Sequence, residues 1–404
     1  MSGRALPAAV AEAIARAGAV ELAAELVRIP SHPGLPRQEE AVARALAAWL
    51  EGRGLRATLD EVRAGRPNLI CTVESGRPGR ELLLCGHTDT VPLNAGDPGA
   101  GFSGEVRDGR LWGRGALDMK GAVAAMAAAL VALHETAALG AGRVTLAAVV
   151  DEEMQGFGAE WLVASGRLGH GAVVGEPTGN QVCLGHKGLE WLEIELVGRS
   201  AHGGTPRAGV NAIVAAARFV ERVERELAPR WAARAHPLLG PPTLNFGTVA
   251  GGDQPSTVAA RCLLAADRRS VPGERYATIV AELEALLDGV RAEMPGLRTE
   301  VRRHPDGVAE TEHLAFATDA DDPLAAAAAA AWRAERGEQA RFGAFPAWTD
   351  GGFFAAAGVP TLVLGPGELA LAHSPLESVP VAEIEEAARL YAATALGYCA
   401  AEPA

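Results

Sequence analysis

The sequence predicts an α/β protein of two domains, in which a main domain built on a largely parallel sheet is interrupted by an inserted ferredoxin-like domain. Three observations predict this class. The chain has 404 residues, 49% of them hydrophobic, which is more than one hydrophobic core usually organises. Strand-like apolar runs alternate with helical patterns toward both ends of the chain, as in covered parallel sheets. Between them the pattern changes to a βαββαβ order.

Residues 1–183 are expected to form the first part of the main domain. Helical periodicity covers 8–28 and 38–51, and an Ala-rich helix is expected at 120–135. Apolar runs predict strands at 68–73, 81–85, 143–150 and 171–175. The alternation of these strands with helices favours a largely parallel sheet.

Residues 184–305 are expected to form the inserted domain, which we interpret as a lid. The predicted elements are strand 187–197, helix 211–227, strand 243–250, strand 258–267, helix 274–292 and strand 298–303. This order is that of a ferredoxin-like unit, so the main domain is expected to be split around it.

Residues 306–404 are expected to complete the main domain. A helix near 322–336 precedes the apolar run GVPTLVLG at 358–365. The final helix is expected from Val381 to Tyr398 and begins after Pro380, a residue suited to a helix start.

Charge and cysteine content exclude several classes of partner. With 50 acidic and 37 basic residues the net charge is -13, which repels a phosphate backbone, so nucleic acid is not an expected partner. The five cysteines are scattered without a C-x-x-C pair, as expected for reduced core thiols in the cytoplasm. We expect no signal peptide, membrane span or membrane partner, because the N-terminus lacks a basic start followed by an apolar core.

Histidine and carboxylate residues lie where several apolar runs end. They are His87 in LLLCGHTDTVP, Asp118 in RGALDMKG, Glu152 and Glu153 in LAAVVDEE, Glu176 in GAVVGEP and His373 in LALAHSPLE. The functional crevice of an open α/β sheet lies beyond the carboxyl ends of its strands. Imidazole and carboxylate are ligands that zinc accepts, and a paired site needs one bridging carboxylate, for which Asp118 is the natural candidate. Together these segments favour a two-metal hydrolase.

Supporting roles follow from the spacing around these residues. Asp89 is two residues from His87, so its carboxylate can hold the other ring nitrogen and fix the orientation of the ligand. Glu152 and Glu153 are adjacent, so their side chains should diverge. One of them can bind metal while the other takes a proton from water.

These motifs resemble the co-catalytic zinc amidohydrolase family of acetylornithine deacetylase, succinyl-diaminopimelate desuccinylase, aminoacylase and glutamate carboxypeptidase. The likeness runs through GHTDTVP, DGRLWGRGALDMKG, DEEMQGFGAE, GEPT, GRSAHGGTPRAGVNAI, AADRRSVPGE and AHSPLESV. The resemblance implies two divalent ions per chain, most often zinc, with cobalt or manganese as alternatives. It assigns His87 and Glu176 to one ion, Glu153 and His373 to the other, Asp118 to the bridge and Glu152 to the general base.

The resemblance also implies roles in the inserted domain. His202 of SAHGG matches a family histidine that reaches the partner subunit's site and stabilises an oxyanion, which implies a homodimer through the lid. Arg269 matches a position that can hold a substrate carboxylate, although an ion pair with Asp267 is the alternative. Ser256 stands where relatives often carry Asn, which affects the expected polar contacts to substrate. A cis peptide between Asp118 and Met119 is also implied.

The expected activity is hydrolysis of the amide bond in an N-acyl amino acid, with short peptides as the alternative substrate class. The same family would allow a dipeptidase or carboxypeptidase. A non-catalytic protein that binds metal or amino acids is the rival reading, and retention of Glu152 argues against it. GAGFSG at 99–104 fits a dinucleotide-binding string in letters only, because no strand precedes it and no helix follows.

Overall fold

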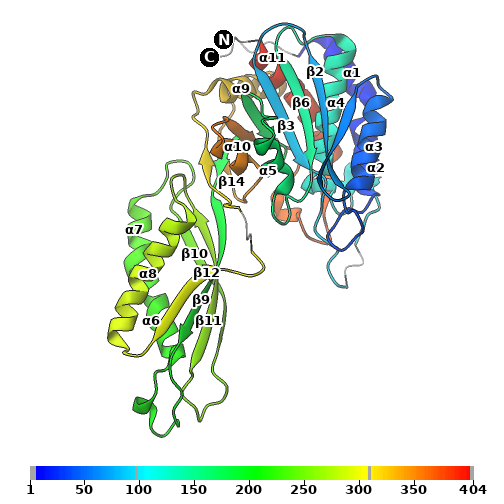
Figure 1. Cartoon of the computed structure of the whole chain (residues 1–404). Coiled ribbons are helices and arrows are strands. Elements are labelled where there is room, and N and C mark those ends of the chain that lie inside the picture. Colours follow the sequence, from blue (N-terminus) through cyan, green and yellow to red (C-terminus); the bar gives the residue numbers. More distant parts are fainter. Residues whose placement is uncertain (1–5, 97–98, 308–310, 401–404) are drawn as a thin grey trace. The chain divides into compact units, whose positions relative to one another are not determined.

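The computed structural model describes residues 6–96, 99–307 and 311–400 (Figure 1). The chain divides into two compact units. Unit 1 comprises Met1–Gly185, Ala317–Phe345 and Thr349–Ala404, and unit 2 comprises His186–Phe316 and Pro346–Trp348. A segment in the middle of the chain therefore forms its own unit, while the two ends of the chain share the other.

Unit 1 is built on a sheet with the strand order β1-β2-β6-β3-β7-β15-β8-β13, and β14 pairs with β8. The strands are β1 (Ala57–Arg63), β2 (Arg66–Glu74), β3 (Glu81–His87), β6 (Arg143–Val149), β7 (Gly171–Val174), β8 (Cys183–His186), β13 (Phe316–Ala317), β14 (Gly343–Phe345) and β15 (Thr361–Val363). β3 is parallel to both β6 and β7, and β7 is parallel to β15. The outer pairs β1–β2, β2–β6 and β8–β15 are antiparallel. The predicted class, a largely parallel sheet covered by helices, is confirmed.

Helices cover both faces of this sheet. They are α1 (Ala8–Ala17), α2 (Ala19–Val27), α3 (Glu40–Glu51), α4 (Gly121–Thr136), α5 (Phe157–Ala164), α9 (Pro323–Arg336), α10 (Gly351–Ala356) and α11 (Val381–Cys399). α4 packs against α1, α2, α11 and the central strands, whereas α5 and α10 contribute to the core on the other face with Leu83 and Cys85. The single helix expected over 8–28 is two helices, because Gly18 adopts φ 74°, a left-handed conformation that interrupts the helix.

The stretch Ala116–Thr136 is long and apolar enough to cross a membrane by length and composition alone, and its residues from Ala116 to Leu133 are all buried within unit 1. Gly86 of β3 lets the sheet approach it closely, because a Cβ there would lie 2.8 Å from the Met119 side chain and 2.9 Å from that of Val123. Its surroundings are those of a central core helix.

A second, small sheet in unit 1 was not predicted. It has the order β16-β5-β4, formed by β4 (Glu105–Arg107), β5 (Arg110–Trp112) and β16 (Ser378–Pro380). Ser378 pairs with Trp112 and Val379 with Leu111, so two segments far apart in sequence are fixed side by side.

Unit 2 has the predicted βαββαβ order with one short helix added. Its elements are β9 (Gly188–Val197), α6 (Ala212–Arg222), α7 (Ala228–Ala233), β10 (Thr243–Gly251), β11 (Arg261–Ser270), α8 (Tyr276–Glu293) and β12 (Arg298–Arg303). The sheet order β10-β11-β9-β12, antiparallel throughout, is the ferredoxin-like arrangement. α6, α7 and α8 lie on one side of it (Figure 1), and Phe219 and Leu283 are buried in the shared core.

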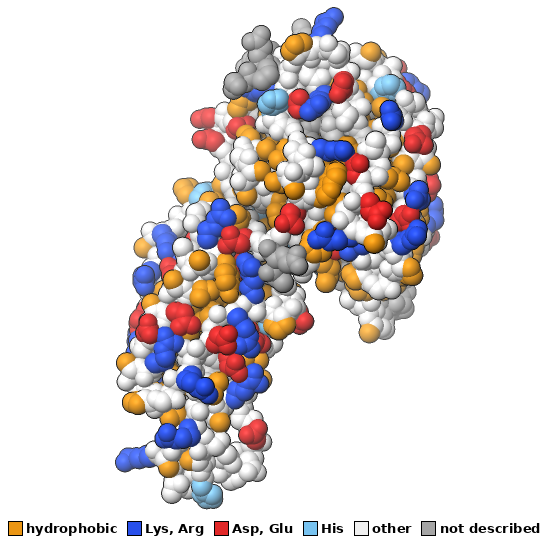
Figure 2. Space-filling view, viewed as in Figure 1, with side chains coloured by type: hydrophobic (Ala, Val, Ile, Leu, Met, Phe, Trp, Pro, Cys, Tyr) orange, Lys and Arg blue, Asp and Glu red, His pale blue; other side chains and the backbone are white. Residues whose placement is uncertain are grey.

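The surface of unit 2 carries charges of both signs. Arg302 pairs with Glu195 at 3.1 Å and Arg303 with Glu190 at 3.1 Å, which joins β12 to β9. On the face shown in Figure 2, basic and acidic side chains are interspersed over this unit.

Candidate metal centre

Three neighbouring parallel strands bring carboxylates and a histidine to one edge of the unit 1 sheet. His87 is the last residue of β3, Glu152 and Glu153 lie just beyond β6, and Glu176 lies two residues beyond β7. Because these strands are adjacent and parallel, their carboxyl ends meet at the same edge. Asp118 reaches this edge from the turn before α4.

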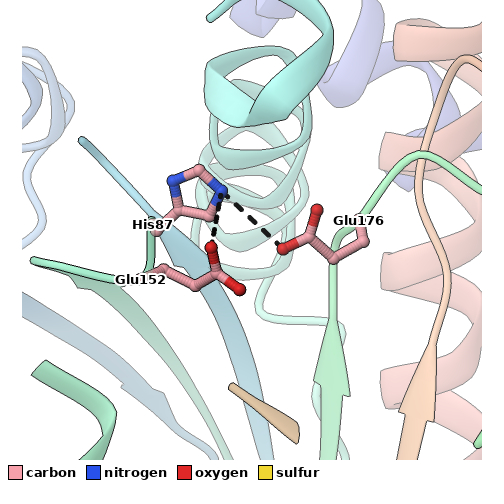
Figure 3. Close-up of side chains that lie close together, drawn as sticks. All are labelled: His87, Glu152 and Glu176. Carbon is pink, nitrogen blue, oxygen red and sulfur yellow. Dashed lines mark ion pairs between the residues drawn. The ribbon is translucent and has the colours of Figure 1, made fainter. Parts of the chain in front are cut away.

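The side chains converge on His87. Its Nε2 lies 3.0 Å from Asp118 Oδ1, 3.7 Å from Glu176 Oε1 and 4.0 Å from Glu152 Oε2. Figure 3 shows the carboxylates of Glu152 and Glu176 both directed toward the same ring nitrogen of His87. His87 is 1% exposed, so these groups meet in an environment shielded from water.

His373 approaches the same cluster from a loop of the C-terminal segment. Its Nε2 lies 3.1 Å from Glu153 Oε1 and 3.2 Å from Asp118 Oδ2. His373 has φ 58°, and its carbonyl accepts a hydrogen bond from Asn94 Nδ2 at 2.9 Å, which anchors the loop. Asp118 therefore presents one oxygen to His87 and the other to His373.

Within the described part of the chain, two groups of side chains have ligand atoms within 4.8 Å of one another: His87, Glu152 and Glu176, and His87, Asp118 and Glu153. Imidazole nitrogen and carboxylate oxygen are the donors of zinc and related divalent ions. Glu152 lies in the first group together with Glu176, so proximity alone does not separate a ligand from a base here.

Charge and hydrogen bonding show that the cluster fits a cation. Glu176 Oε1 is buried and has no hydrogen-bond partner among the described residues. Burial, followed by repulsion from Asp118, raises the pKa of Glu176 well above its usual value. Burial and the neighbouring Glu176 likewise raise the pKa of Glu152. A divalent ion would supply the positive charge that these carboxylates lack.

The histidines respond to the same carboxylates. Hydrogen bonds with Asp118 and then Glu153 raise the pKa of His373 to about 10. Burial opposes protonation of His87, but the hydrogen bond with Asp118 and the charge of Glu176 outweigh it and raise the pKa well above the ordinary value. Burial also opposes ionisation of Asp118, yet its hydrogen bonds with His373 and His87 lower its pKa. The two histidines thus favour the ionised form of Asp118.

Asp89 supports the cluster through hydrogen bonds that involve backbone groups, both its own and those of the two glutamates. Its carboxylate accepts hydrogen bonds from the N–H groups of Glu152 at 3.2 Å and Glu153 at 3.0 Å. His87 Nδ1 lies 3.0 Å from the carbonyl oxygen of Asp89 and 3.6 Å from its carboxylate. The ring is therefore oriented by the Asp89 backbone, and the carboxylate holds the segment that carries both glutamates.

The segment from Asp151 to Gly156 has a second support that sequence reasoning missed. Arg66 Nη2 donates to Asp151 Oδ1 at 2.6 Å, and its Nε donates to buried Glu39 at 2.8 Å. Asp151 adopts φ 73°, and its carboxylate accepts the N–H of Gln155. Asp151 thus braces this segment through its side chain, and Arg66 and Glu39 belong to no motif that could have identified them.

Glu377 and Asp350 were also not anticipated. Glu377 is buried and contacts the segment that carries Asp118. Asp350 is 1% exposed, and its Oδ1 has no hydrogen-bond partner among the described residues. Burial raises the pKa of Asp350, with further repulsion from Asp89. Of these two residues, only Glu377 had a signal in the sequence, because it lies four residues after His373 in the segment AHSPLESV. The peptide between Asp118 and Met119 is cis, as the resemblance implied.

The residues expected to contact substrate from the inserted domain lie in unit 2. His202 is exposed, and its Nδ1 accepts the N–H of Gly204 at 3.0 Å, so Nε2 carries the proton of the neutral ring. The carbonyl of Ser256 accepts the N–H of Gly203 at 2.7 Å and braces this loop. Arg269 makes two hydrogen bonds to Asp267, at 2.7 and 3.0 Å, which is the alternative ion pair that the sequence allowed.

Known proteins resemble the chain in sequence over nearly all of its length. Acetylornithine deacetylase of Proteus mirabilis is 33% identical over 95% of this chain and 98% of its own. Acetylornithine deacetylase of Myxococcus xanthus is 30% identical over 91% of this chain and 93% of its own.

Solved structures share the fold. Aminopeptidase PepT from Bacillus cereus has a TM-score of 0.77 at 23% identity and covers 94% of this chain and 98% of its own. The YXEP protein of Bacillus subtilis, a dinuclear metal binding peptidase, has a TM-score of 0.69 at 16% identity over 95% of this chain and 98% of its own. Residues 83–397 match the model of peptidase family M20/M25/M40, and this span holds the whole carboxylate and histidine cluster. The chain therefore belongs to peptidase family M20/M25/M40 and is a metal-dependent amidohydrolase or peptidase.

Proposed function

We propose that the protein is a deacylase that hydrolyses the amide bond of an N-acyl amino acid. The observation that carries this proposal is the likeness to acetylornithine deacetylases over nearly the whole of both chains. The cluster around His87 and Asp118 supplies the residue types that such hydrolysis needs. The products are a carboxylate and a free amine, formed from one amide and one water.

We infer that two divalent ions per chain serve the reaction, with zinc as the first choice and cobalt or manganese as ions that the same donors accept. His87 and Glu176 would hold one ion, and Glu153 and His373 the other. The two oxygens of Asp118, which face different histidines, support its role as the bridge. When bound, such ions polarise the scissile carbonyl and make water more acidic.

Glu152 is proposed as the general base. Glu153 lies 3.1 Å from the ring of His373, whereas among the described residues the nearest cationic partner of the Glu152 carboxylate is His87 at 4.0 Å. Glu152 would take a proton from the attacking water and deliver it to the leaving amine nitrogen, so one carboxylate serves both halves of the reaction. Asp89 would hold Glu152 in place through its backbone N–H.

Unit 2 is proposed as a lid and dimerisation domain, with His202 stabilising the oxyanion in the partner subunit's site and Arg269 binding a substrate carboxylate. Arg269 would have to exchange Asp267 for substrate. Support for a homodimer comes from β10, an edge strand with mostly exposed residues, including Val249 at 69% exposure. The free, buried cysteines support a cytoplasmic location.

The proposal is tested with a panel of N-acetyl, N-succinyl and N-formyl amino acids together with dipeptides, offered to zinc-loaded and chelated protein. Cleavage of one acyl class that stops with chelator and returns with zinc is the expected result. Cleavage of dipeptides alone would replace the deacylase by a peptidase. Absence of turnover across the panel by zinc-loaded protein would overturn the proposal.

A further inference from the structure

The buried carboxylate of Glu377 accepts hydrogen bonds from four donors of a single segment. Its side chain is 2% exposed. Its Oε1 accepts hydrogen bonds from the backbone N–H of Gly115 at 2.7 Å and, more weakly, from those of Leu117 and Asp118 at 3.3 Å. Its Oε2 accepts from the guanidinium of Arg114. The segment that carries Asp118 is thus gathered around one side chain more than 250 residues away in sequence.

Glu377 also belongs to the loop that carries His373. Its own N–H donates to the carbonyl of Ser374 at 3.2 Å, and its carbonyl accepts the N–H of Gly113 at 3.2 Å. Pairing of β16 with β5 begins at the next residue, so the contact has a fixed register. Glu377 therefore ties together the two segments whose side chains, Asp118 and His373, meet at 3.2 Å.

An ionised carboxylate at this buried position carries a desolvation penalty. Burial, and then repulsion from Asp118, raises the pKa of Glu377 to about 7, and Arg114 counters this. A buried ion pair is weak evidence for a contribution to stability, because its desolvation cost offsets the attraction. The effect of Glu377 on local geometry is clearer, because one carboxylate can accept hydrogen bonds from several N–H groups at once.

We propose that Glu377, held by Arg114, is a positioning residue of the metal centre, which sets the backbone at Asp118 so that its two oxygens face His87 and His373. This inference rests on the proposed two-metal function. It assigns to Glu377 no contact with substrate or ion. Loss of its hydrogen bonds should let the Asp118 side chain move away from one of the two histidines, and the ion that depends on that geometry should bind more weakly.

The test is titration of the chelated, full-length protein with Co²⁺, followed by absorption and by counting bound ions after dialysis. Glu377→Ala should weaken binding of one of the two ions by about 10- to 100-fold, as loss of partners behind metal ligands typically does. Glu377→Gln keeps an oxygen for the N–H groups but not the charge for Arg114, so its affinity should lie between those of the Ala variant and the unaltered protein.

Glu274→Ala is the matched control, because Glu274 also pairs with a buried arginine, Arg268 at 2.9 Å, and accepts a backbone N–H, that of Val271 at 3.0 Å, but lies in unit 2. Its Co²⁺ affinity should equal that of the unaltered protein. Unchanged affinity for both ions in folded Glu377→Gln and Glu377→Ala protein would overturn the inference. If the Ala variant does not fold, the Gln variant decides alone.

The titration separates this inference from the proposed function. Ion binding that weakens in the Glu377 variants, with no cleavage of any N-acyl amino acid by the unaltered protein, would reject the deacylase and keep the positioning role. Deacylation that persists unchanged with full Co²⁺ affinity in both variants would do the reverse.

Discussion

Asp118 is the residue on which the two histidines of the candidate metal centre converge. Its Oδ1 lies 3.0 Å from His87 and its Oδ2 lies 3.2 Å from His373. Two oxygens directed to different partners are what a carboxylate needs to bridge two ions. The sequence indicated Asp118 as the natural candidate for the bridge that a paired site needs, and its position just before a helix also favours the ionised carboxylate.

Glu152 should be needed for turnover but not for metal binding. Glu152→Gln removes the proton acceptor while keeping the size of the side chain, so kcat should fall by about 10²- to 10⁴-fold. Metal content, measured on the same sample by elemental analysis, should stay at the level of the unaltered protein. Glu160→Gln, at an exposed site in α5, is the control and should leave both quantities unchanged. Full activity of metal-loaded Glu152→Gln would refute the base, and loss of an ion would make Glu152 a ligand.

Metal affinity should increase with pH. Without metal, hydrogen bonds with Asp118 and then Glu153 raise the pKa of His373 to about 10, so the ring holds a proton below that pH. An ion must displace this proton, because only the neutral ring offers a lone pair. Calorimetric titration with Zn²⁺ between pH 6 and 8, in buffers of different ionisation enthalpy, should show proton release and tighter binding at higher pH. Affinity independent of pH, with no proton released, would contradict this charge state.

At the scale of elements, the parallel strands explain why the sequence identified most of the site. Apolar runs ending at His87, before Glu152 and Glu153, and before Glu176 predicted strand ends, and adjacent parallel strands bring such ends together. The sequence also singled out His373, which follows an apolar run, but only the family resemblance assigned it to a particular ion, because its loop has no periodic pattern. The spacing of Arg269 and Asp267 in the sequence could not decide whether Arg269 pairs with Asp267 or binds a substrate carboxylate.

Elements that depend on distant partners were not predictable. The strands β4, β5 and β16 have three residues each, too few for a periodic signal, and they exist because segments near 112 and 378 meet. The break between α1 and α2 depends on the left-handed conformation of Gly18, whereas the sequence around it continues the helical pattern.

Arg66 should stabilise the segment between β6 and α5. Its guanidinium pairs with Glu39, which is fully buried, and with Asp151. Arg66→Met should lower the free energy of unfolding by about 3 kcal/mol, because it leaves a buried carboxylate without its partner. Urea denaturation measures this.

Arg44→Met is the matched control for Arg66. Arg44 pairs with Glu40 at 2.7 Å, but its side chain is 64% exposed, so the loss should be below about 1 kcal/mol. Equal effects of the two substitutions would show that the buried network contributes no more than a surface ion pair.

In the whole molecule, the two units carry different residues of the proposed function. Unit 1 carries every histidine and carboxylate of the candidate metal centre, and unit 2 carries His202 and Arg269. The βαββαβ order of unit 2 was predictable because its four strands and its helices α6 and α8 are long enough to carry a periodic pattern, whereas the short helix α7 was not predicted. The lid and dimer roles stay predictions.

Dimerisation through unit 2 predicts a sensitive edge at β10. Val249 is 69% exposed on this edge strand, so Val249→Lys should place a charge in the interface and shift the protein from dimer to monomer in analytical ultracentrifugation. Val106→Lys, at a 50% exposed site in unit 1, should leave the dimer intact. A dimer unaffected by Val249→Lys would exclude this edge, and a monomeric unaltered protein would refute the dimer.

We expect this chain to hydrolyse N-acyl amino acids with metal ions held by the cluster around Asp118. The most direct measurement is a titration of chelated protein with Zn²⁺ in which the release of free amine from the best N-acyl substrate and the number of bound ions are followed together. Hydrolysis should be negligible without metal, and its rate should rise until two ions are bound per chain. Hydrolysis at full rate by the chelated protein, or none with both ions bound, would contradict it.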